Sequence, residues 1–266
     1  MVVAASAAGN WVVSTRSVSD PAARLFCFPH AGGSYVAFSG WRERLPTDVE
    51  VISFCYPGRL RLIREAPLTD LRTLVAELDT AISGLLDVPF VFLGHSLGAL
   101  VAFELSRHLR SKNGPQPAAL ILSGRAAPQL PRRLPDLHRL PPDELLVQLR
   151  ALEGLPPGLE QNEEFLSLIL PTIRADLQMH ETYAYAEQPP LDAAILALAG
   201  WSDPQATPPD VEAWKCQTTS AFSFRTFPGG HFFLFSVRDE LLAMVGQALP
   251  EWLRGPGDGP CLARQD

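Results

Sequence analysis

The chain has 266 residues, of which 47% are apolar and 19% are charged, a composition typical of a folded globular protein and unlike that of a disordered one. A formal net charge of −7 and the lack of a long basic stripe argue against a general nucleic-acid binder. No apolar run approaches the roughly 18 residues of a membrane-spanning helix. We therefore expect neither nucleic acid nor a membrane as a partner.

Residues 1–22 are expected to form a flexible leader with one short strand near Trp11–Val13. The apolar start lacks the basic residue that opens a secretory signal, because the first basic residue is Arg16. Cysteines 27, 55, 216 and 261 are widely spaced and show no metal-binding pattern. Free thiols without an export signal predict a cytoplasmic protein that holds no metal.

Short apolar runs alternate with longer helical patterns between residues 23 and 254, which predicts one α/β domain with a mostly parallel sheet. The Gly- and Pro-rich residues 255–266 are expected to form a flexible tail. The predicted strands are Leu25–Phe28, Val49–Cys55, Phe90–Leu93, Ala119–Ser123, Ala194–Ala199 and Phe222–Phe227. The predicted helices are Val36–Arg44, Asp70–Leu86, Leu97–Arg110, Val211–Gln217 and Arg238–Leu253.

One stretch interrupts this alternation. Residues 128–190 contain several prolines and helical patterns at Asp143–Leu152 and Glu163–Tyr185, but no strand pattern. The stretch is too long for an ordinary connection, so it predicts a helical insertion. Such an insertion in an α/β enzyme is either a lid over the active site or a subdomain without a catalytic role.

The segment Gly94-His95-Ser96-Leu97-Gly98 joins a predicted buried strand to a predicted helix. This G-x-S-x-G pattern in a strand–turn–helix context predicts a nucleophile elbow that exposes the Ser96 hydroxyl. The turn is so tight that side chains at the two glycines would collide with neighbouring elements. The helix start directs the backbone N–H of Leu97 at the reacting oxygen.

A serine hydroxyl needs a base, and six histidines are candidates. His231 follows the last predicted strand in a loop containing two glycines and a proline, which is where a hydrolase with the order Ser, acid, His places its base. His95 lies within the elbow and His30 in an early Gly-rich loop, where we assign it to shaping the loop. The others, His108, His138 and His180, are assigned to surface or packing roles.

The third catalytic partner should be an acid at the end of a late strand. Asp203 is the first acid after the strand Ala194–Ala199, where it would hold the His231 imidazole in one tautomer. Asp192 precedes that strand and Asp210 lies near a helix start, where acids commonly cap. We therefore predict Ser96, Asp203 and His231 as the triad.

An oxyanion hole needs a second N–H from the loop after an early strand. The strand at Leu25–Phe28 runs into Pro29-His30-Ala31-Gly32-Gly33. Proline has no N–H, so the prediction is that the Ala31 amide acts together with the Leu97 amide. A phosphate loop is not indicated, because its lysine pattern is absent.

These blocks together resemble the stand-alone type II thioesterases of polyketide synthases and nonribosomal peptide synthetases. The matching segments extend in order over about residues 24–253 and are Phe28–Gly33, Tyr56–Arg59, Phe92–Ala99, Pro171–Asp176, Gly200–Asp203 and Phe227–Phe232. The first, second and last of these are specific in combination, although none is specific alone. The resemblance implies an α/β-hydrolase fold with a helical lid at about residues 128–190. It implies the same triad and oxyanion amides.

The activity implied is hydrolysis of stalled or aberrant acyl groups from the phosphopantetheine thiol of an acyl or peptidyl carrier protein, without a cofactor. The alternatives are a general carboxylester hydrolase, a medium-chain fatty acyl thioesterase and a non-catalytic ligand-binding relative. Because carrier proteins are typically acidic, a basic docking patch is expected. The candidates are Arg59, Arg61, Arg64, Arg132 and Arg133.

Overall fold

The computed structural model describes residues 10–14, 18–133, 135–152, 154 and 162–253. The tail expected at 255–266 lies outside this part, as do residues 1–9 and 15–17 of the expected leader. Within the described leader, Trp11 is buried and β1 (Val12–Ser14) pairs antiparallel with β3 (Val49–Phe54). The short strand expected near this position is therefore present, one residue further along the chain.

The described residues form one seven-stranded sheet in the order β1-β3-β2-β4-β5-β6-β7, in which every pairing except that of β1 is parallel. Strands β2 to β6 consist of buried residues, as the consecutive apolar positions predict for a sheet covered on both faces. The bounds are β2 Ala23–Phe28, β3 Val49–Phe54, β4 Phe90–His95, β5 Ala119–Ser123, β6 Ala194–Gly200 and β7 Phe222–Phe227.

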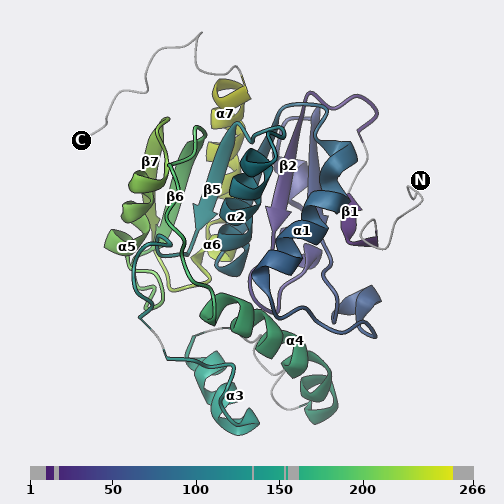
Figure 1. Ribbon diagram of the computed structural model, residues 1–266, viewed down its shortest axis with the longest axis vertical. Helices are drawn as coiled ribbons and strands as arrows, with labels where there is room; N and C mark the ends of the chain where they lie inside the picture. The colour runs from purple at the N-terminus through teal and green to yellow at the C-terminus, as the bar shows by residue number, and fades with distance from the viewer. Residues whose placement is uncertain (1–9, 15–17, 134, 153, 155–161, 254–266) are drawn as a thin grey trace.

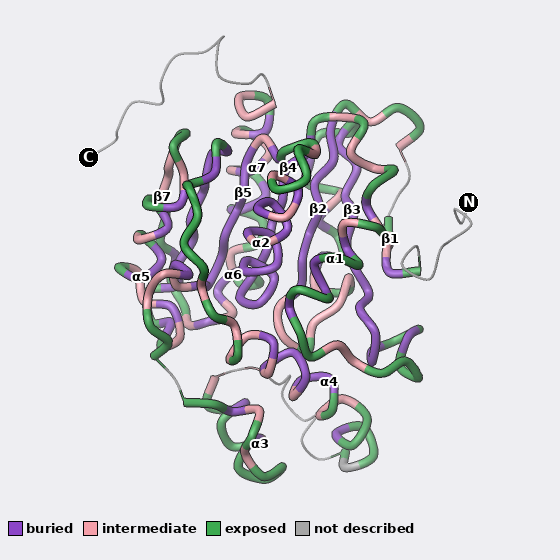
Figure 2. The backbone as a smooth tube through the Cα atoms, in the orientation of Figure 1, coloured by how far each residue is buried: buried purple, intermediate pink, exposed green. Residues whose placement is uncertain are grey.

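Helices cover both faces of the sheet (Figure 1). One face packs against α1 (Leu71–Ile82) and α2 (Leu97–Ser111), and the other against α7 (Arg238–Leu253). Figure 2 shows the buried chain concentrated in the central strands and along α2. The remaining helical segments are η2 Tyr35–Phe38, η3 Trp41–Arg44, η4 Leu60–Leu62, η5 Ser83–Leu85, α5 Pro208–Glu212, η7 Ala213–Gln217 and α6 Phe233–Ser236.

Two predicted helices take a different form. The pattern Val36–Arg44 forms two 3₁₀ turns, η2 and η3, because Gly40 adopts a left-handed conformation at φ 78° and a right-handed helix cannot continue through it. The pattern Val211–Gln217 divides into the end of α5 and the 3₁₀ turn η7. α5 begins earlier than predicted, at Pro208, since proline favours the first turn of a helix.

The insertion between β5 and β6 contains α3 (Pro142–Ala151) and α4 (Glu163–Glu181). Both helices lie beyond the carboxyl ends of the strands, toward which the arrowheads point in Figure 1. Strands β2 and β4 are neighbours although β3 separates them in the chain, so the loops after them meet at the point where the strand order reverses. Open parallel sheets bind ligands at such a point.

None of the helices in the described part of the chain is long and apolar enough to cross a membrane.

Candidate active site

Ser96 lies between the end of β4 and the first residue of α2, with φ 56° and ψ −115°, a conformation that a side-chain-bearing residue rarely adopts. The surrounding packing explains both flanking glycines. A Cβ on Gly94 would lie 2.0 Å from the carbonyl oxygen of Gly98, and one on Gly98 would lie 2.0 Å from that of Phe28. The predicted strand–turn–helix elbow is therefore present, and it is held against the end of β2.

Ser96, His231 and Asp203 are in contact, although 135 residues separate the first two. The Oγ of Ser96 lies 3.0 Å from Nε2 of His231, and Nδ1 of His231 lies 2.8 Å from Oδ2 of Asp203. All three side chains are buried. A carboxylate at Nδ1 leaves Nε2 free to accept the serine proton, which is the arrangement that acyl transfer through a serine requires.

Backbone contacts hold the acid and the histidine loop together. The N–H of Ser202 donates to the carbonyl oxygen of Gly229 at 2.9 Å, and a Cβ on Gly200 would lie 2.4 Å from the carbonyl oxygen of Gly230. The second carboxylate oxygen of Asp203 accepts the backbone N–H of Gln205 at 2.8 Å. The carboxylate is thus fixed by its own turn while it contacts His231.

The loop after β2, which carries Ala31, packs beside the elbow and against α4. The N–H of Gly32 donates to Oδ2 of Asp176 on α4 at 2.7 Å. Leu97 is the first residue of α2, and the first N–H groups of a helix have no partner within it. Both predicted oxyanion amides therefore belong to segments that border Ser96.

His95 and His30 lie beside the triad but outside it. Nδ1 of His95 is 3.0 Å from Oγ of Ser123, and burial, followed by the nearby His231, holds the pKa of His95 well below its ordinary value. Burial, again followed by His231, lowers the pKa of His30 to about 4. The His30 ring packs on Phe232, with centroids 5.1 Å apart. Both imidazoles are therefore neutral at pH 7, and the ring contact of His30 agrees with its expected role in shaping the loop.

Ser96 and His231 open into a cavity of about 90 Å³ under the insertion. It is also lined by Arg125, His180 and Tyr183, none of which was predicted as a site residue. Arg125 follows β5, and its position just past the carboxyl end of a predicted strand was the signal that could have identified it. His180 is near the end of α4 and was assigned to surface or packing, because helical periodicity does not show what a helix covers.

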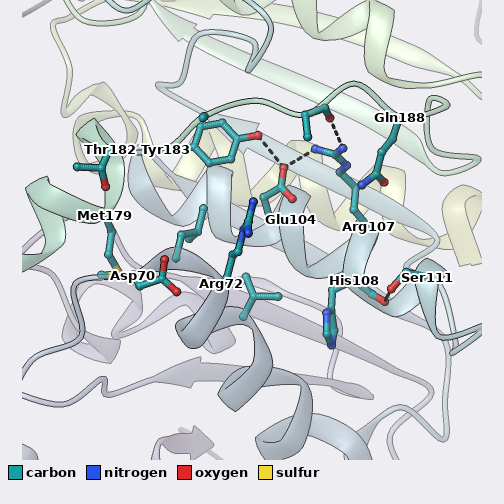
Figure 3. A pocket seen from close by; sticks show the side chains of 14 residues that line it. Asp70, Arg72, Glu104, Arg107, His108, Ser111, Met179, Thr182, Tyr183 and Gln188 are labelled. Atoms are coloured by element: carbon teal, nitrogen blue, oxygen red, sulfur yellow. Dashed lines mark hydrogen bonds and ion pairs between the residues drawn. The ribbon is translucent and has the colours of Figure 1, made fainter.

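A second cavity, of about 600 Å³, lies between α1, α2 and the end of α4 (Figure 3). Its described lining includes neither Ser96 nor His231. Tyr183 lines both cavities and donates a hydrogen bond to Oε1 of Glu104 at 2.7 Å, an acid that Arg107 also contacts. The larger cavity is therefore separate from the reacting serine, with Tyr183 at the boundary.

One cluster has ligand types that metals use. Asp136, His138 and Glu181 place their ligand atoms within 4.8 Å of one another in the insertion. Asp136 is paired with Arg132 at 2.7 Å, while Glu181 accepts the backbone N–H of His138 at 3.0 Å. These contacts show that the acidic groups of the cluster bind other parts of the insertion and stabilise its structure.

The predicted basic patch is wrong at Arg59. Its side chain is buried and forms an ion pair with Asp176 at 2.8 Å, so it cannot meet a partner protein. Arg133 pairs with Asp210, and Arg61 donates to the carbonyl oxygens of the leader. The other four candidates, Arg61, Arg64, Arg132 and Arg133, are exposed, so their part in a docking surface stays a prediction.

Known proteins are similar to the chain over most of its length. The family model of the thioesterase domain matches residues 23–249. Two relatives are LgrE of Brevibacillus parabrevis, named linear gramicidin dehydrogenase, and GrsT of Aneurinibacillus migulanus, a gramicidin S biosynthesis protein. They are 40% and 39% identical, and each alignment covers 92% of this chain and 95% of the relative.

A solved structure agrees with these relatives. BorB, the type II thioesterase from the borrelidin biosynthetic cluster, is 36% identical and superposes with a TM-score of 0.83 over 90% of this chain and 97% of its own. The chain is a member of the thioesterase family, a group of α/β-hydrolases that cleave acyl thioesters.

Proposed function

We propose that this thioesterase hydrolyses stalled or aberrant acyl groups from the phosphopantetheine thiol of acyl or peptidyl carrier proteins, with Ser96, His231 and Asp203 as its triad. The observation that carries the proposal is the 3.0 Å contact between Oγ of Ser96 and Nε2 of His231 at a strained elbow. The similarity to a type II thioesterase supports the carrier-bound substrate. The serine geometry favours hydrolysis over the dehydrogenase activity named for LgrE.

The reaction proceeds in two halves. The Oγ of Ser96 attacks the thioester carbonyl carbon as its proton passes to Nε2 of His231. The amides of Ala31 and Leu97 hold the oxyanion, and the thiol departs with the proton from His231. Water then gives a proton to His231 and attacks the acyl-serine. Release of the acid returns the proton to Ser96.

The insertion is proposed to form a lid and part of the acyl site, which Leu177 and His180 of α4 support by lining the catalytic cavity. Leu177→Ala removes side-chain volume from the lining and so enlarges the cavity. We expect this change to shift the preferred acyl chain toward greater length. Hydrolysis rates across carrier-bound acyl groups of increasing length test this. An unchanged length profile would count against a substrate-binding role for the insertion.

We place the activity in the cytoplasm, together with the carrier protein. Cys27 and Cys55 are buried free thiols and Cys216 is an exposed one, as a reducing compartment would keep them. Cys261 lies outside the described residues.

The decisive experiment measures release of acetate from an acetylated carrier protein. Ser96→Ala should abolish turnover and the acyl-enzyme adduct seen by mass spectrometry. Ser106→Ala is the matched control, since Ser106 is a fully buried serine of α2, the helix that follows Ser96, and its hydroxyl donates to the Ala102 carbonyl oxygen. Full turnover by Ser96→Ala would overturn the proposal.

Two further comparisons separate the other candidates. Matched acyl thioesters and oxygen esters should show a preference for the thioester, whereas preference for the oxygen ester would identify a carboxylester hydrolase. A fluorophosphonate probe should label Ser96, and failure to do so would indicate a non-catalytic relative.

A further inference from the structure

Arg125 is a buried cation in the catalytic cavity and has no counter-ion among the residues that the structure describes. It follows β5 and lines the same cavity as Ser96 and His231. The residue is only 7% exposed, and its buried Nε and Nη1 atoms lack a hydrogen-bond partner among the described residues. No hydrogen bond or ion pair joins this guanidinium to the residues that the structure describes.

The acids nearest this cavity are already engaged by other groups. Glu181 is the acidic residue in the described lining, and it accepts the backbone N–H groups of Leu137 at 2.9 Å and His138 at 3.0 Å. Asp210, beside the cavity, pairs with Arg133 at 2.8 Å. Neither carboxylate contacts Arg125.

The acid on the far side of Tyr183 is engaged as well. Figure 3 shows Glu104 between the Tyr183 hydroxyl and the Arg107 guanidinium, which lie 2.7 Å and 2.6 Å from its Oε1. Glu104 is therefore held by its own two donors. The positive charge of Arg125 has no matching negative charge in its described surroundings.

Burying a guanidinium whose N–H groups have no acceptor is unfavourable, unless a ligand supplies the missing acceptors and the negative charge. Burial lowers the pKa of Arg125 to about 10, so the group remains charged at neutral pH. Burial, followed by the proximity of Arg125, also keeps the pKa of His180 well below its ordinary value, so His180 adds no charge there. Two other arginines line the cavity, but Arg132 pairs with Asp136 and Arg133 pairs with Asp210. Among the arginines of the described lining, Arg125 is thus the one whose donors have no described partner.

We propose that Arg125 is a specificity-determining residue that binds an anionic group of the thioester substrate, either a carboxylate or a phosphate. This inference rests on the function proposed above. A planar guanidinium matches the oxygens of a carboxylate or a phosphate. Two parts of a carrier-bound substrate carry such oxygens. One is a carboxylate on the acyl group, as in malonyl thioesters, and the other is the phosphate of phosphopantetheine.

Three small substrates separate these sources. They are acetyl-pantetheine, which has neither group, malonyl-pantetheine, which adds the carboxylate, and acetyl-phosphopantetheine, which adds the phosphate. The measurement is kcat/KM for the wild-type enzyme and for Arg125→Gln. Loss of a charge-assisted hydrogen bond should lower kcat/KM about 10- to 100-fold for one anionic substrate, and less than about twofold for acetyl-pantetheine.

The identity of the affected substrate assigns the source. A selective loss on malonyl-pantetheine assigns the acyl carboxylate, and one on acetyl-phosphopantetheine assigns the phosphate. Arg225→Gln is the control, since Arg225 is an exposed arginine on β7 and should leave all three values unchanged. Arg125→Lys keeps the charge without the planar fork, so it should show an intermediate, equally selective loss, and it replaces Arg125→Gln if that variant fails to fold.

An equal change on all three substrates, or no change on any, overturns the proposal. That result is distinguishable from failure of the proposed function. Hydrolysis of acetyl-pantetheine by the wild-type enzyme and its loss in Ser96→Ala test the thioesterase chemistry independently of Arg125.

Discussion

Arg59 and Asp176 join the loop after β3 to helix α4 through two hydrogen bonds of 2.8 and 2.9 Å, and both side chains are buried. The same carboxylate accepts the N–H of Gly32, and the same guanidinium donates to the carbonyl oxygen of Gly33 at 2.7 Å. One ion pair therefore fastens the insertion to the loop that carries Ala31.

Breaking this pair should destabilise the protein strongly. Asp176→Ala leaves a buried guanidinium without its partner, and we expect the free energy of unfolding to fall by about 3–5 kcal/mol. Urea denaturation measures the change. Asp239→Ala removes an exposed partner of Arg44 and should cost less than about 1 kcal/mol. Equal decreases in the free energy of unfolding of the two variants would show that the buried pair stabilises the fold no more than an exposed one.

Asp203→Asn should preserve the fold while impairing catalysis. An amide retains the shape of the carboxylate but favours the wrong imidazole tautomer at His231, so kcat should fall about 10³- to 10⁴-fold. Steady-state hydrolysis of an acyl thioester gives the value. Asp192→Asn is the matched control, because this exposed acid precedes β6 and should leave kcat within about twofold. Comparable losses would remove Asp203 from the triad.

Glycine at position 98 is required by backbone packing. In Gly98→Ala the new Cβ would meet the carbonyl oxygen of Phe28 at 2.0 Å, so the elbow and the end of β2 must separate. We expect loss of both thermal stability and activity. Gly84→Ala meets nothing within 4 Å and should be neutral or stabilising by up to about 1 kcal/mol. A fully active Gly98→Ala would contradict the close approach described above.

Acid should destabilise the folded protein through its buried histidines. The pKa values of His30, His95 and His180 are lowered chiefly by burial, that of His30 to about 4, so the unfolded chain binds more protons below about pH 6.5. Stability is complete above that pH and is lost as the pH falls toward 4. Each such histidine contributes a slope of at most about 1.4 kcal/mol per pH unit.

Denaturation at pH 8, 6 and 5 measures this slope. His95→Gln removes one buried imidazole and should give a shallower pH dependence than the wild type, even if it is less stable at pH 8. A slope identical to that of the wild type would show that His95 does not carry the effect.

The elements that could be predicted from sequence are those with local causes. β5, β7 and α7 have the predicted bounds, since continuous apolar runs and helical periodicity are properties of neighbouring residues. The elbow at Ser96 was equally predictable, because its glycines are required by a single tight turn. The continuous helix predicted at Val36–Arg44 is wrong, because Gly40 adopts a left-handed conformation that a right-handed helix cannot include.

The amino-acid sequence by itself thus determined the parallel α/β arrangement and the order of serine, acid and histidine along the chain. The tertiary structure decided that these three side chains meet at 3.0 and 2.8 Å and that Arg59 is an internal ion-pair partner. It also decided that Arg125 lines the cavity with no counter-ion from the described part of the chain. The physical reason is that burial and pairing depend on which distant loops share the carboxyl edge of the sheet. Strand order sets that proximity, and no local pattern encodes it.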